Sequence, residues 1–461
     1  MSMSGSFDQH DKRGERALSH DEYSEALGSF QAALDAARAP HERARALDGM
    51  AHASFRLKED ARAFDLLEQA IALCLPTADT DRQAALALAR AWYDKAGMCA
   101  QLGRVKDALE VLEPSVSRFK NQATTVDEHN REELRFRLVV VRSMDMKATA
   151  LRKLDRKRDA VACYDDMIRR FEPVADVAVE EVVSRAMLNR AWLLGDLGRG
   201  DEEIAAYDSL VMRYGENHLL SVSHTIIDAL TGKLQCYREQ EDFEEALKAV
   251  DDLIRRYEFD PGEGIAERVA RTMIRRAGLL NKLGRTEDEL AAYDSVSLHF
   301  SHFKDPEVRR HVAKSLMFKA VTLNDADQSA AEIECYDEVV RRYAEDKDDE
   351  VRTVAADALI HKGLSLGAIA EDAAEDTGVR EIDAEIACYD QVVARYGGEE
   401  FIGLERAVAE ALLHKGDTLL EAGRVSEASA CLDAIIQGYA ANEDNDLQEI
   451  VTDARDLKAQ I

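Results

Sequence analysis

The sequence predicts an all-α protein, built as a right-handed α-solenoid of about ten helix pairs. Three observations favour this fold class: a phrase with a 43-residue period, apolar residues at helical spacing, and very little proline. Only 6 of the 461 residues are proline, against about 5% in average proteins, which disfavours a loop-rich or all-β chain. Hydrophobic residues make up 46% of the chain, so it can bury a large core and is not a disordered acidic chain.

The repeated phrase reads VACYDDMIRRF at 161–171, IAAYDSLVMRY at 204–214, LAAYDSVSLHF at 290–300, IECYDEVVRRY at 333–343 and IACYDQVVARY at 386–396. With weaker copies included, its central residue (the anchor) is Phe30, Leu67, Leu112, Tyr164, Tyr207, Val250, Tyr293, Tyr336, Tyr389 and Leu432. Five of the spacings between anchors are 43 residues. One spacing of 53 indicates about ten inserted residues at 369–382, expected to form an acidic loop, and one of 52 places extra residues near 120–131.

Each repeat reads as two helices, here called helix A and helix B. Apolar residues fall at helical spacing in 308–323, and the anchor phrase forms the second helix. Between them a glycine can take the left-handed conformation that ends a helix: Gly103, Gly198, Gly284 and Gly423. A second rung lies seven residues after the anchor, on the same helix face: Phe119, Phe171, Tyr214, Tyr257, Phe300, Tyr343, Tyr396 and Tyr439. We interpret both rungs as core packing rather than as a platform for bases or a cofactor.

Small residues recur in the middle of helix A, where they let two helices approach closely: Gly14, Ala51, Ala96, Ala148, Ala191, Ala277, Ala320, Gly363 and Gly416, with Leu234 as the exception. With the anchor phrase, this pattern resembles the tetratricopeptide repeat family, in its bacterial form L-G-R-x-x-E-A-I-x-x-Y-D, over essentially the whole chain. Two departures matter. The period is longer, which predicts longer helices, and glutamate replaces a small residue early in helix B at Glu203, Glu289, Glu332 and Glu385. These glutamates indicate a position at the edge of the helix contact or a rotated helix. A period of 43 also falls in the HEAT range, so HEAT-like packing stays an alternative.

Charge divides the chain. The net charge is −30, but residues 1–200 hold 33 acidic and 31 basic residues, and residues 201–461 hold 57 and 29. We predict near-neutral repeats 1–4 and the start of 5 at 1–200, strongly acidic repeats 5–10 at 201–440, and a C-terminal capping helix at 441–461, since solenoids need polar caps. The acidic total argues against nucleic acid as a partner.

A basic residue lies at one position of helix A in nine of the ten repeats, seventeen residues before the anchor, or 27 in the repeat of Tyr389 with its ten inserted residues: Arg13, Lys95, Lys147, Arg190, Lys233, Arg276, Lys319, Lys362 and Lys415. An acid directly follows nine anchors: Glu68, Glu113, Asp165, Asp208, Asp251, Asp294, Asp337, Asp390 and Asp433. We interpret the two series as a partly buried ladder within each repeat, although Arg13 then faces Gln31 and Met50 breaks the series. The alternative is a cationic stripe for an acidic ligand.

A second series lies five residues earlier on helix A, and the resemblance implies that this position lines the concave groove. It begins with four arginines, which can hold carboxylates with two donors, and its last two members are acidic: Asp357 and Glu410. With aromatic neighbours of the kind found in binding hot spots, the candidate partner-binding residues are Arg45, Arg90, Tyr93, Arg142, Arg185, Trp192, Arg271 and Lys314. The alternative is a solvated helix face with ion pairs along the helix.

Catalytic, cofactor and metal motifs are absent from the sequence: it has no phosphate-binding glycine loop, no G-x-S-x-G and no H-E-x-x-H. Cys163, Cys335, Cys388 and Cys431 each precede an anchor, which indicates small buried core residues rather than reactive thiols. A metal or pH-sensing role for the equivalent pair His361 and His414 is the less favoured interpretation. We therefore predict no enzyme, no cofactor and no metal.

The sequence favours a non-enzymatic scaffold or adaptor that binds a partner protein or peptide in the concave groove. Two alternatives are a ligand-sensing regulatory subunit that controls a bacterial effector, and a scaffold that self-assembles head to tail, a possible homo-oligomer. Seven scattered cysteines, a polar Met1–His10 and the lack of an 18-residue apolar run favour a cytoplasmic protein without a membrane partner. The composition, rich in alanine, arginine and aspartate, suggests a bacterial source.

Overall fold

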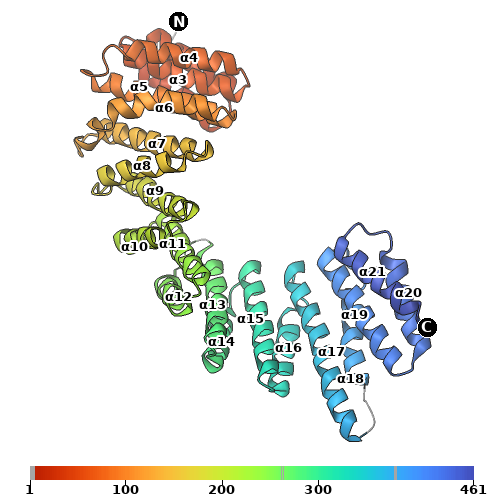
Figure 1. Ribbon diagram of the computed structural model, residues 1–461. Coiled ribbons are helices and arrows are strands. Elements are labelled where there is room, and N and C mark those ends of the chain that lie inside the picture. Colours follow the sequence, from red (N-terminus) through yellow and green to blue (C-terminus); the bar gives the residue numbers. More distant parts are fainter. Residues whose placement is uncertain (1–5, 261, 263, 378–381) are drawn as a thin grey trace. The chain divides into compact units, whose positions relative to one another are not determined.

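The computed structural model describes residues 6–260, 262, 264–377 and 382–461, and within these all regular structure is helical (Figure 1). The A helices are α1 (Phe7–Ser19), α3 (Pro40–Arg56), α5 (Arg82–Gln101), α7 (Arg131–Lys153), α9 (Val177–Asp196), α11 (Leu220–Glu239), α13 (Ile265–Lys282), α15 (Pro306–Asp325), α17 (Asp349–Thr377), α19 (Ile402–Glu421) and α21 (Asn445–Lys458). The B helices are α2 (Tyr23–Ala36), α4 (Asp60–Cys74), α6 (Val105–Phe119), α8 (Lys157–Phe171), α10 (Gly200–Tyr214), α12 (Phe243–Tyr257), α14 (Thr286–Phe300), α16 (Ser329–Tyr343), α18 (Asp383–Tyr396) and α20 (Val425–Tyr439). The prediction of an all-α solenoid of about ten helix pairs is confirmed.

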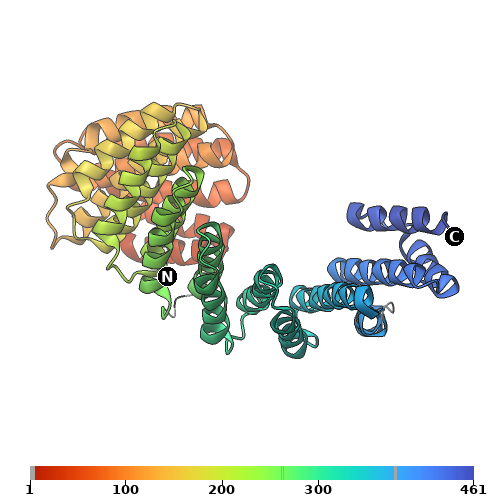
Figure 2. The ribbon, with the colours of Figure 1, turned by 60° about the horizontal axis from the view of Figure 1, so that its bottom comes forward.

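The chain forms two compact units. Unit 1 ends at Cys236 and unit 2 begins at Tyr237. Within each unit, helices A and B of one repeat pack side by side and the next repeat stacks on them, as the red-to-green and the blue helices show (Figure 2). Among the described residues no helix combines the length and the apolar character needed to cross a membrane.

The turns between helices A and B share one backbone conformation. Gly103, Gly198, Gly284 and Gly423 have φ between 68° and 74°, as predicted. At the corresponding turns of other repeats the left-handed residue is not glycine: Asp21, Lys58, Asp155, Glu241 and Asp327. A side chain there costs about 1 kcal/mol or somewhat more. The turn is therefore set by the packing of its two helices, and glycine only makes it easier.

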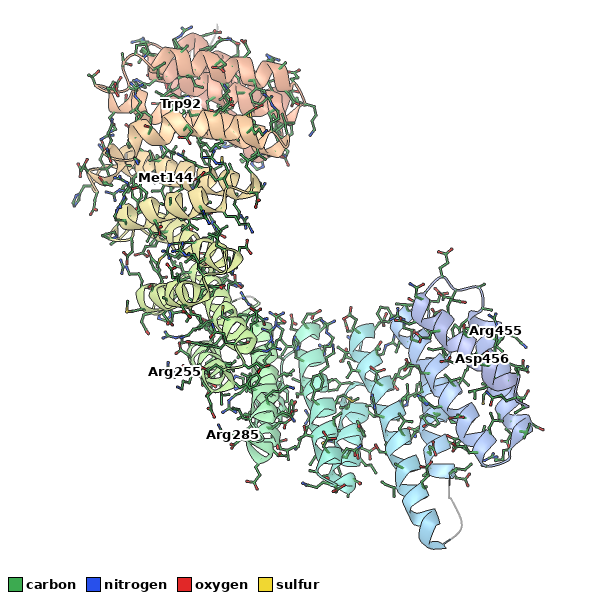
Figure 3. The ribbon with its side chains drawn as sticks, viewed as in Figure 1. Trp92, Met144, Arg255, Arg285, Arg455 and Asp456 are labelled. Carbon is green, nitrogen blue, oxygen red and sulfur yellow. The ribbon has the colours of Figure 1, made fainter. Side chains whose placement is uncertain are left out.

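The two aromatic rungs form the core, as predicted. Nine of the ten anchors are at most 2% exposed, and Tyr293 is 6% exposed. The second rung joins neighbouring repeats: the ring of Phe119 lies 5.3 Å from that of Phe136 and 6.0 Å from that of Trp92, which Figure 3 labels in unit 1. These rings come from α6, α7 and α5, so one second-rung residue connects a B helix to two A helices.

The described residues of both insertions contain helical structure. The expectation of an acidic loop at 369–382 is wrong for 369–377, because α17 continues to Thr377 through a stretch rich in helix-forming alanine and glutamate. Residues 378–381 lie outside the described part. The insertion near 120–131 contains a 3₁₀ helix, η1 (Gln122–Thr124). The buried Arg137 donates to the Ala123 carbonyl oxygen at 3.2 Å, which fixes this insertion against α7.

Three of the four glutamates early in helix B lie inside the repeat interface rather than at its edge, whereas Glu203 is half-buried and accepts from Tyr207 of its own helix. Glu289, Glu332 and Glu385 are 2%, 2% and 4% exposed. Each accepts a hydrogen bond from a hydroxyl group of the next A helix: Thr322 to Glu289, Ser365 to Glu332 and Thr418 to Glu385. The glutamate thus fills the space left between two A helices and satisfies a polar group there.

The ladder of cations and acids exists, but the predicted pairing within a repeat is wrong. Arg13 pairs with Glu25 of its own repeat. Every later cation pairs with the acid of the preceding repeat: Lys95–Glu68, Lys147–Glu113, Arg190–Asp165, Lys233–Asp208, Arg276–Asp251, Lys319–Asp294, Lys362–Asp337, Lys415–Asp390 and Lys458–Asp433. The residue after the anchor points away from its own helix A and toward the next one. Pairing between repeats also explains the two uncharged positions of the series. Gln31 replaces the acid of the first repeat and Met50 replaces the cation of the second, so these two residues occupy the same junction.

The last ion pair of the ladder shows which position α21 takes in the stack of helices. Lys458 on α21 pairs with Asp433 on α20, so α21 occupies the place of an eleventh helix A. Leu447, Val451 and Ala454 are buried against α19 and α20.

We expect each ladder pair to stabilise the fold only weakly. In a double-mutant cycle of Lys319→Met and Asp294→Asn, the coupling free energy should be about 0.2–1 kcal/mol, because the Asp294 side chain is 59% exposed to water. Urea unfolding at low and high salt measures it, and the coupling should decrease with salt. A salt-independent coupling above about 3 kcal/mol would show instead that the pair behaves as a buried one.

Candidate functional site: the A-helix groove of unit 1

The A helices of unit 1 line two hollows, here called the unit 1 groove. The larger, about 360 Å³, is lined by α1, α2, α3, α5 and α7 and includes Tyr93, Asp94 and Met146. The smaller, about 100 Å³, includes Asp11, Arg45 and Arg90. His52 lines both hollows, so the two are neighbours. The groove therefore contains the first part of the predicted arginine row.

Three of the four row arginines pair with aspartates from the preceding A helix. Arg45 Nε lies 3.0 Å from Asp11 Oδ2, and Arg90 Nε lies 3.0 Å from Asp48 Oδ2. Arg185 donates to Asp145 at 3.0 Å. Asp11 and Asp48 are 1% and 3% exposed. The arginine side chains are still 38% to 53% exposed, so each holds a buried carboxylate while part of it faces the groove.

These aspartates were not among the predicted site residues, although they share one position of the sequence repeat. Each lies three residues after the row position of its own repeat: Asp11, Asp48 and Asp145. The predicted alternative of ion pairs along one helix describes the row only in part. Arg90 Nε lies 3.6 Å from Asp94 Oδ2 on its own helix, but the pairs with the three aspartates run between repeats.

Arg142 is the row member whose aspartate is missing. The equivalent residue of the preceding repeat is Tyr93, and the described residues provide no ion pair to Arg142, which is exposed. The two residues are near neighbours: burial raises the pKa of Tyr93, and the positive charges of Arg142 and Arg185 act in the opposite direction. Arg142 is thus a guanidinium without a carboxylate partner among the described residues, next to the half-buried Tyr93 that lines the groove.

Trp192 is 42% exposed on α9. It lies seven residues after Arg185, on the same helix face. Arg185, Arg142 and Tyr93 form one electrostatic neighbourhood, to which Asp145 also belongs. An aromatic ring near an exposed arginine is the combination that protein interfaces favour.

A second cluster in the groove is made of Asp48, His52 and Asp94. One donor atom from each lies within 4.8 Å of the others. Burial, and then the nearby Asp48 carboxylate, raise the pKa of Asp94, while His52 and Arg90 oppose this. Sequence reasoning missed this cluster because its members belong to different repeats and to different positions within them.

The remaining predicted site residues, Arg271 and Lys314, lie in unit 2. Arg271 pairs with Glu267 one turn earlier on α13, at 3.3 Å. Lys314 is exposed and lies near Asp357 of the next A helix. Burial, and then Glu410, raise the pKa of Asp357 to about 7, and Lys314 lowers it.

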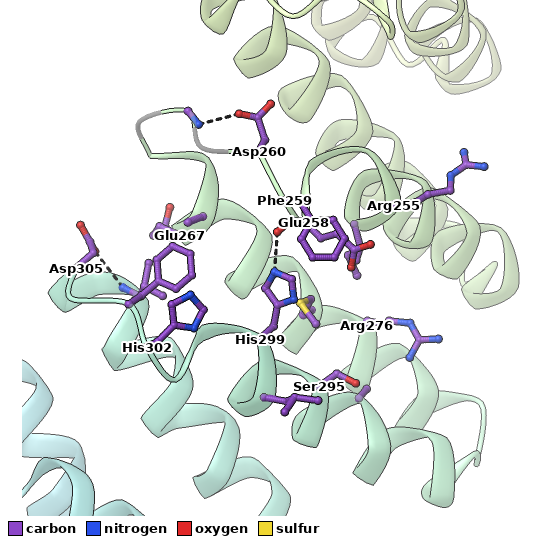
Figure 4. Close-up of a pocket in the computed structure, with 18 of the residues that line it drawn as sticks. Arg255, Glu258, Phe259, Asp260, Glu267, Arg276, Ser295, His299, His302 and Asp305 are labelled. Carbon is purple, nitrogen blue, oxygen red and sulfur yellow. Dashed lines mark hydrogen bonds between the residues drawn. The ribbon is translucent and has the colours of Figure 1, made fainter.

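Unit 2 also contains a pocket of about 1180 Å³ between α12, α13, α14 and the start of α15 (Figure 4). Its mouth carries two apolar side chains that are 80% and 84% exposed, Phe259 and Leu298. The His299 ring points to the segment after α12, with Nε2 2.7 Å from the Glu258 carbonyl oxygen. Arg276 pairs with Asp251 at 2.7 Å. These polar groups are thus engaged within the fold, and the pocket presents mainly apolar contacts.

The cysteines are buried or half-buried, and the repeated histidines pack on two anchor rings. Burial raises the pKa of the Cys163 thiol to about 11, which makes its reactive thiolate rare at neutral pH. His361 and His414 stack on the anchors Tyr336 and Tyr389, with ring centroids 6.1 Å and 6.0 Å apart. Burial lowers the pKa of both histidines.

Stacked helix pairs with a ladder between repeats and a groove along the A helices define a helical-repeat protein. Residues 146–217 and 234–296 match the model of the tetratricopeptide repeat. These two segments are thus tetratricopeptide repeats, as the sequence pattern indicated. Such repeats support a scaffold for protein interactions in general.

Several solved structures share a limited likeness with the chain. BtubC (BKLC) from P. vanneervenii is 15% identical, with 51% of this chain and 91% of that chain covered and a TM-score of 0.34. The apo form of RapI is 10% identical, with 90% and 98% covered and a TM-score of 0.41. A tetratricopeptide repeat protein from Parabacteroides merdae ATCC 43184 is 10% identical, with 78% and 100% covered and a TM-score of 0.31. No curated protein sequence matches the chain.

Proposed function

We propose that the protein is a non-enzymatic scaffold that binds a carboxylate-bearing segment of a partner protein in the unit 1 groove. The observation that carries this proposal is the gap in the arginine–aspartate series at Arg142. Its neighbours Arg45, Arg90 and Arg185 each hold an aspartate, whereas the position opposite Arg142 is Tyr93. An aspartate or glutamate of the partner would supply the missing acid.

The surroundings of Arg142 support a side chain that combines charge and apolar surface. Tyr93 and Met146 line the adjoining hollow, and Trp192 is exposed on α9. A guanidinium binds a carboxylate through two parallel hydrogen bonds, which fixes the direction of the bound segment. The charge of half-exposed Arg185 is offset by Asp145, so the positive charge that remains for a partner is that of Arg142.

We expect Arg142→Glu to weaken binding of an acidic peptide at least about tenfold, because it replaces an attraction by a repulsion. Fluorescence polarisation with a panel of labelled peptides that combine aspartate or glutamate with an aromatic residue measures this. Peptides with lysine in place of the acids should not bind. The matched control is Arg158→Glu, which makes the same charge change on the exposed face of helix B α8.

Two results would contradict the proposal: no acidic peptide binds folded wild-type protein, or Arg142→Glu and Arg158→Glu weaken binding equally. Self-assembly has its own signature. Residues 201–461 carry a net charge of −28, so head-to-tail association would raise the mass seen by light scattering at low salt, and salt would reverse it. A ligand-sensing subunit would instead change its compactness on titration with a small molecule.

A further inference from the structure

The two carboxylates beside His52 are oriented by Arg90. Arg90 Nε lies 3.0 Å from Asp48 Oδ2 and 3.6 Å from Asp94 Oδ2. The Oδ1 atoms face His52: Asp94 Oδ1 lies 3.6 Å from Nε2 and Asp48 Oδ1 lies 4.0 Å from Nδ1. One arginine thus holds one oxygen of each aspartate and leaves the other oxygens on the side of the imidazole.

The Asp48 carboxylate is only partly satisfied where it stands. It is 3% exposed, and apart from the ion pair of its Oδ2 with Arg90 neither of its oxygens accepts a hydrogen bond within the described residues. Buried carboxylate oxygens nearly always have hydrogen-bond partners in folded proteins. When both aspartates are ionised and His52 is neutral, Arg90 offsets only one of the two negative charges. The ionised cluster can therefore accept one further cation.

His52 presents the ring nitrogen that a metal needs. Its Nδ1 lies 3.1 Å from the Asp48 carbonyl oxygen, and because a carbonyl only accepts, Nδ1 carries the hydrogen. The neutral ring then keeps the lone pair of Nε2. A histidine that donates through one nitrogen to a backbone carbonyl and binds metal through the other is the usual arrangement in metal sites.

We propose that Asp48, His52 and Asp94 bind a divalent transition-metal ion of the zinc type. Two carboxylate oxygens and one imidazole nitrogen suit such an ion better than Mg²⁺ or Ca²⁺, which prefer oxygen ligands alone. Ligands about 2.1 Å from zinc in tetrahedral geometry lie about 3.4 Å apart. The 3.6 Å between His52 Nε2 and Asp94 Oδ1 already matches this spacing. The ion can enter through the groove, since the His52 side chain is 37% exposed and lines both hollows.

The test is isothermal titration of the chelator-treated full chain with Zn²⁺, and separately with Mg²⁺. We expect saturable binding of one Zn²⁺ and no comparable binding of Mg²⁺. His52→Ala and Asp94→Asn should each weaken Zn²⁺ binding at least about tenfold. The matched control is His311→Ala, which removes a histidine paired with a carboxylate outside the cluster, Glu267 at 3.0 Å. It should leave the Zn²⁺ affinity unchanged.

Arg90→Gln separates a metal site from a purely electrostatic cluster, because the arginine and the metal offset the same two carboxylates. This variant should bind Zn²⁺ more tightly than the wild type. Circular dichroism establishes that each variant is folded before titration. The proposal is overturned if the folded wild type takes up no Zn²⁺, or if His52→Ala and Asp94→Asn bind it as tightly as the wild type. It does not depend on the partner-binding function, which is measured with peptides and without metal.

Discussion

Replacement of Phe119 by alanine is expected to lower the free energy of unfolding of unit 1 by about 3–5 kcal/mol. Phe119 is fully buried at the last position of α6, and its ring contacts rings from both neighbouring A helices. Alanine would remove all of these contacts and leave a cavity. The backbone could close this cavity only by moving α5 and α7 together, which the packing of their other side chains opposes.

Urea unfolding followed by tryptophan fluorescence measures this loss, because both tryptophans of the chain lie in unit 1: Trp92 and Trp192. Trp92 is 8% exposed and touches the mutated site, so it reports directly on it. Phe119→Leu keeps most of the apolar volume and should cost less than about 1.5 kcal/mol. Phe318→Ala, at a ring that is 45% exposed in unit 2, should leave the tryptophan transition unchanged. Equal midpoints for Phe119→Ala and wild type would show that this ring does not join the repeats.

Replacement of Glu289 by alanine is expected to destabilise unit 2 by about 1–3 kcal/mol, although it removes a charge from a strongly acidic segment. The Glu289 carboxylate is 2% exposed and accepts from Thr322 at 2.7 Å and from Asn281 at 3.0 Å. Its neighbour Tyr293 also depends on it, since burial and then Glu289 raise the pKa of the Tyr293 hydroxyl. Without the carboxylate these donors lie in a dry interface with fewer acceptors.

Far-UV circular dichroism in urea measures the Glu289→Ala effect, with Glu287→Ala as the control. Glu287 lies on the same helix but is exposed, so its loss should change stability by less than about 0.5 kcal/mol. Adding Thr322→Val to Glu289→Ala should recover part of the loss, because it removes an unsatisfied hydroxyl group. If both alanine variants unfold at the same urea concentration, the buried glutamate is not part of the repeat interface.

Periodic features of the chain could be predicted because they recur at equivalent positions in most repeats. The anchors, the second rung and the left-handed glycines all follow from one sequence period, and errors in a single copy do not matter. The buried glutamates show the limit of this reasoning. They also repeat, but their environment depends on a hydroxyl group of the next helix, Thr322 for Glu289, whose contact is set by the stacking angle.

The candidate site was harder to predict for two physical reasons. Ion pairs between repeats depend on which helix a residue faces. Each ladder cation from Lys95 to Lys415 has one acid in its own repeat and one in the preceding repeat, and the sequence alone does not distinguish these two partners. The prediction therefore chose the acid of the same repeat, which is wrong. The Asp48–His52–Asp94 cluster arises where the pattern is broken, since Asp94 lies one residue after the position that Asp48 occupies in its own repeat. Such singular features carry no periodic signal.

The register of the ladder also decides how this chain could be rearranged during evolution. An internal repeat presents a cation to the repeat before it and an acid to the repeat after it, so these repeats are interchangeable parts. Deletion of the repeat anchored at Tyr336, for example, would place Asp294 opposite Lys362 and conserve a matched pair. The first junction follows a different code, with Gln31 and Met50, so the first repeat fits only at the beginning of the array.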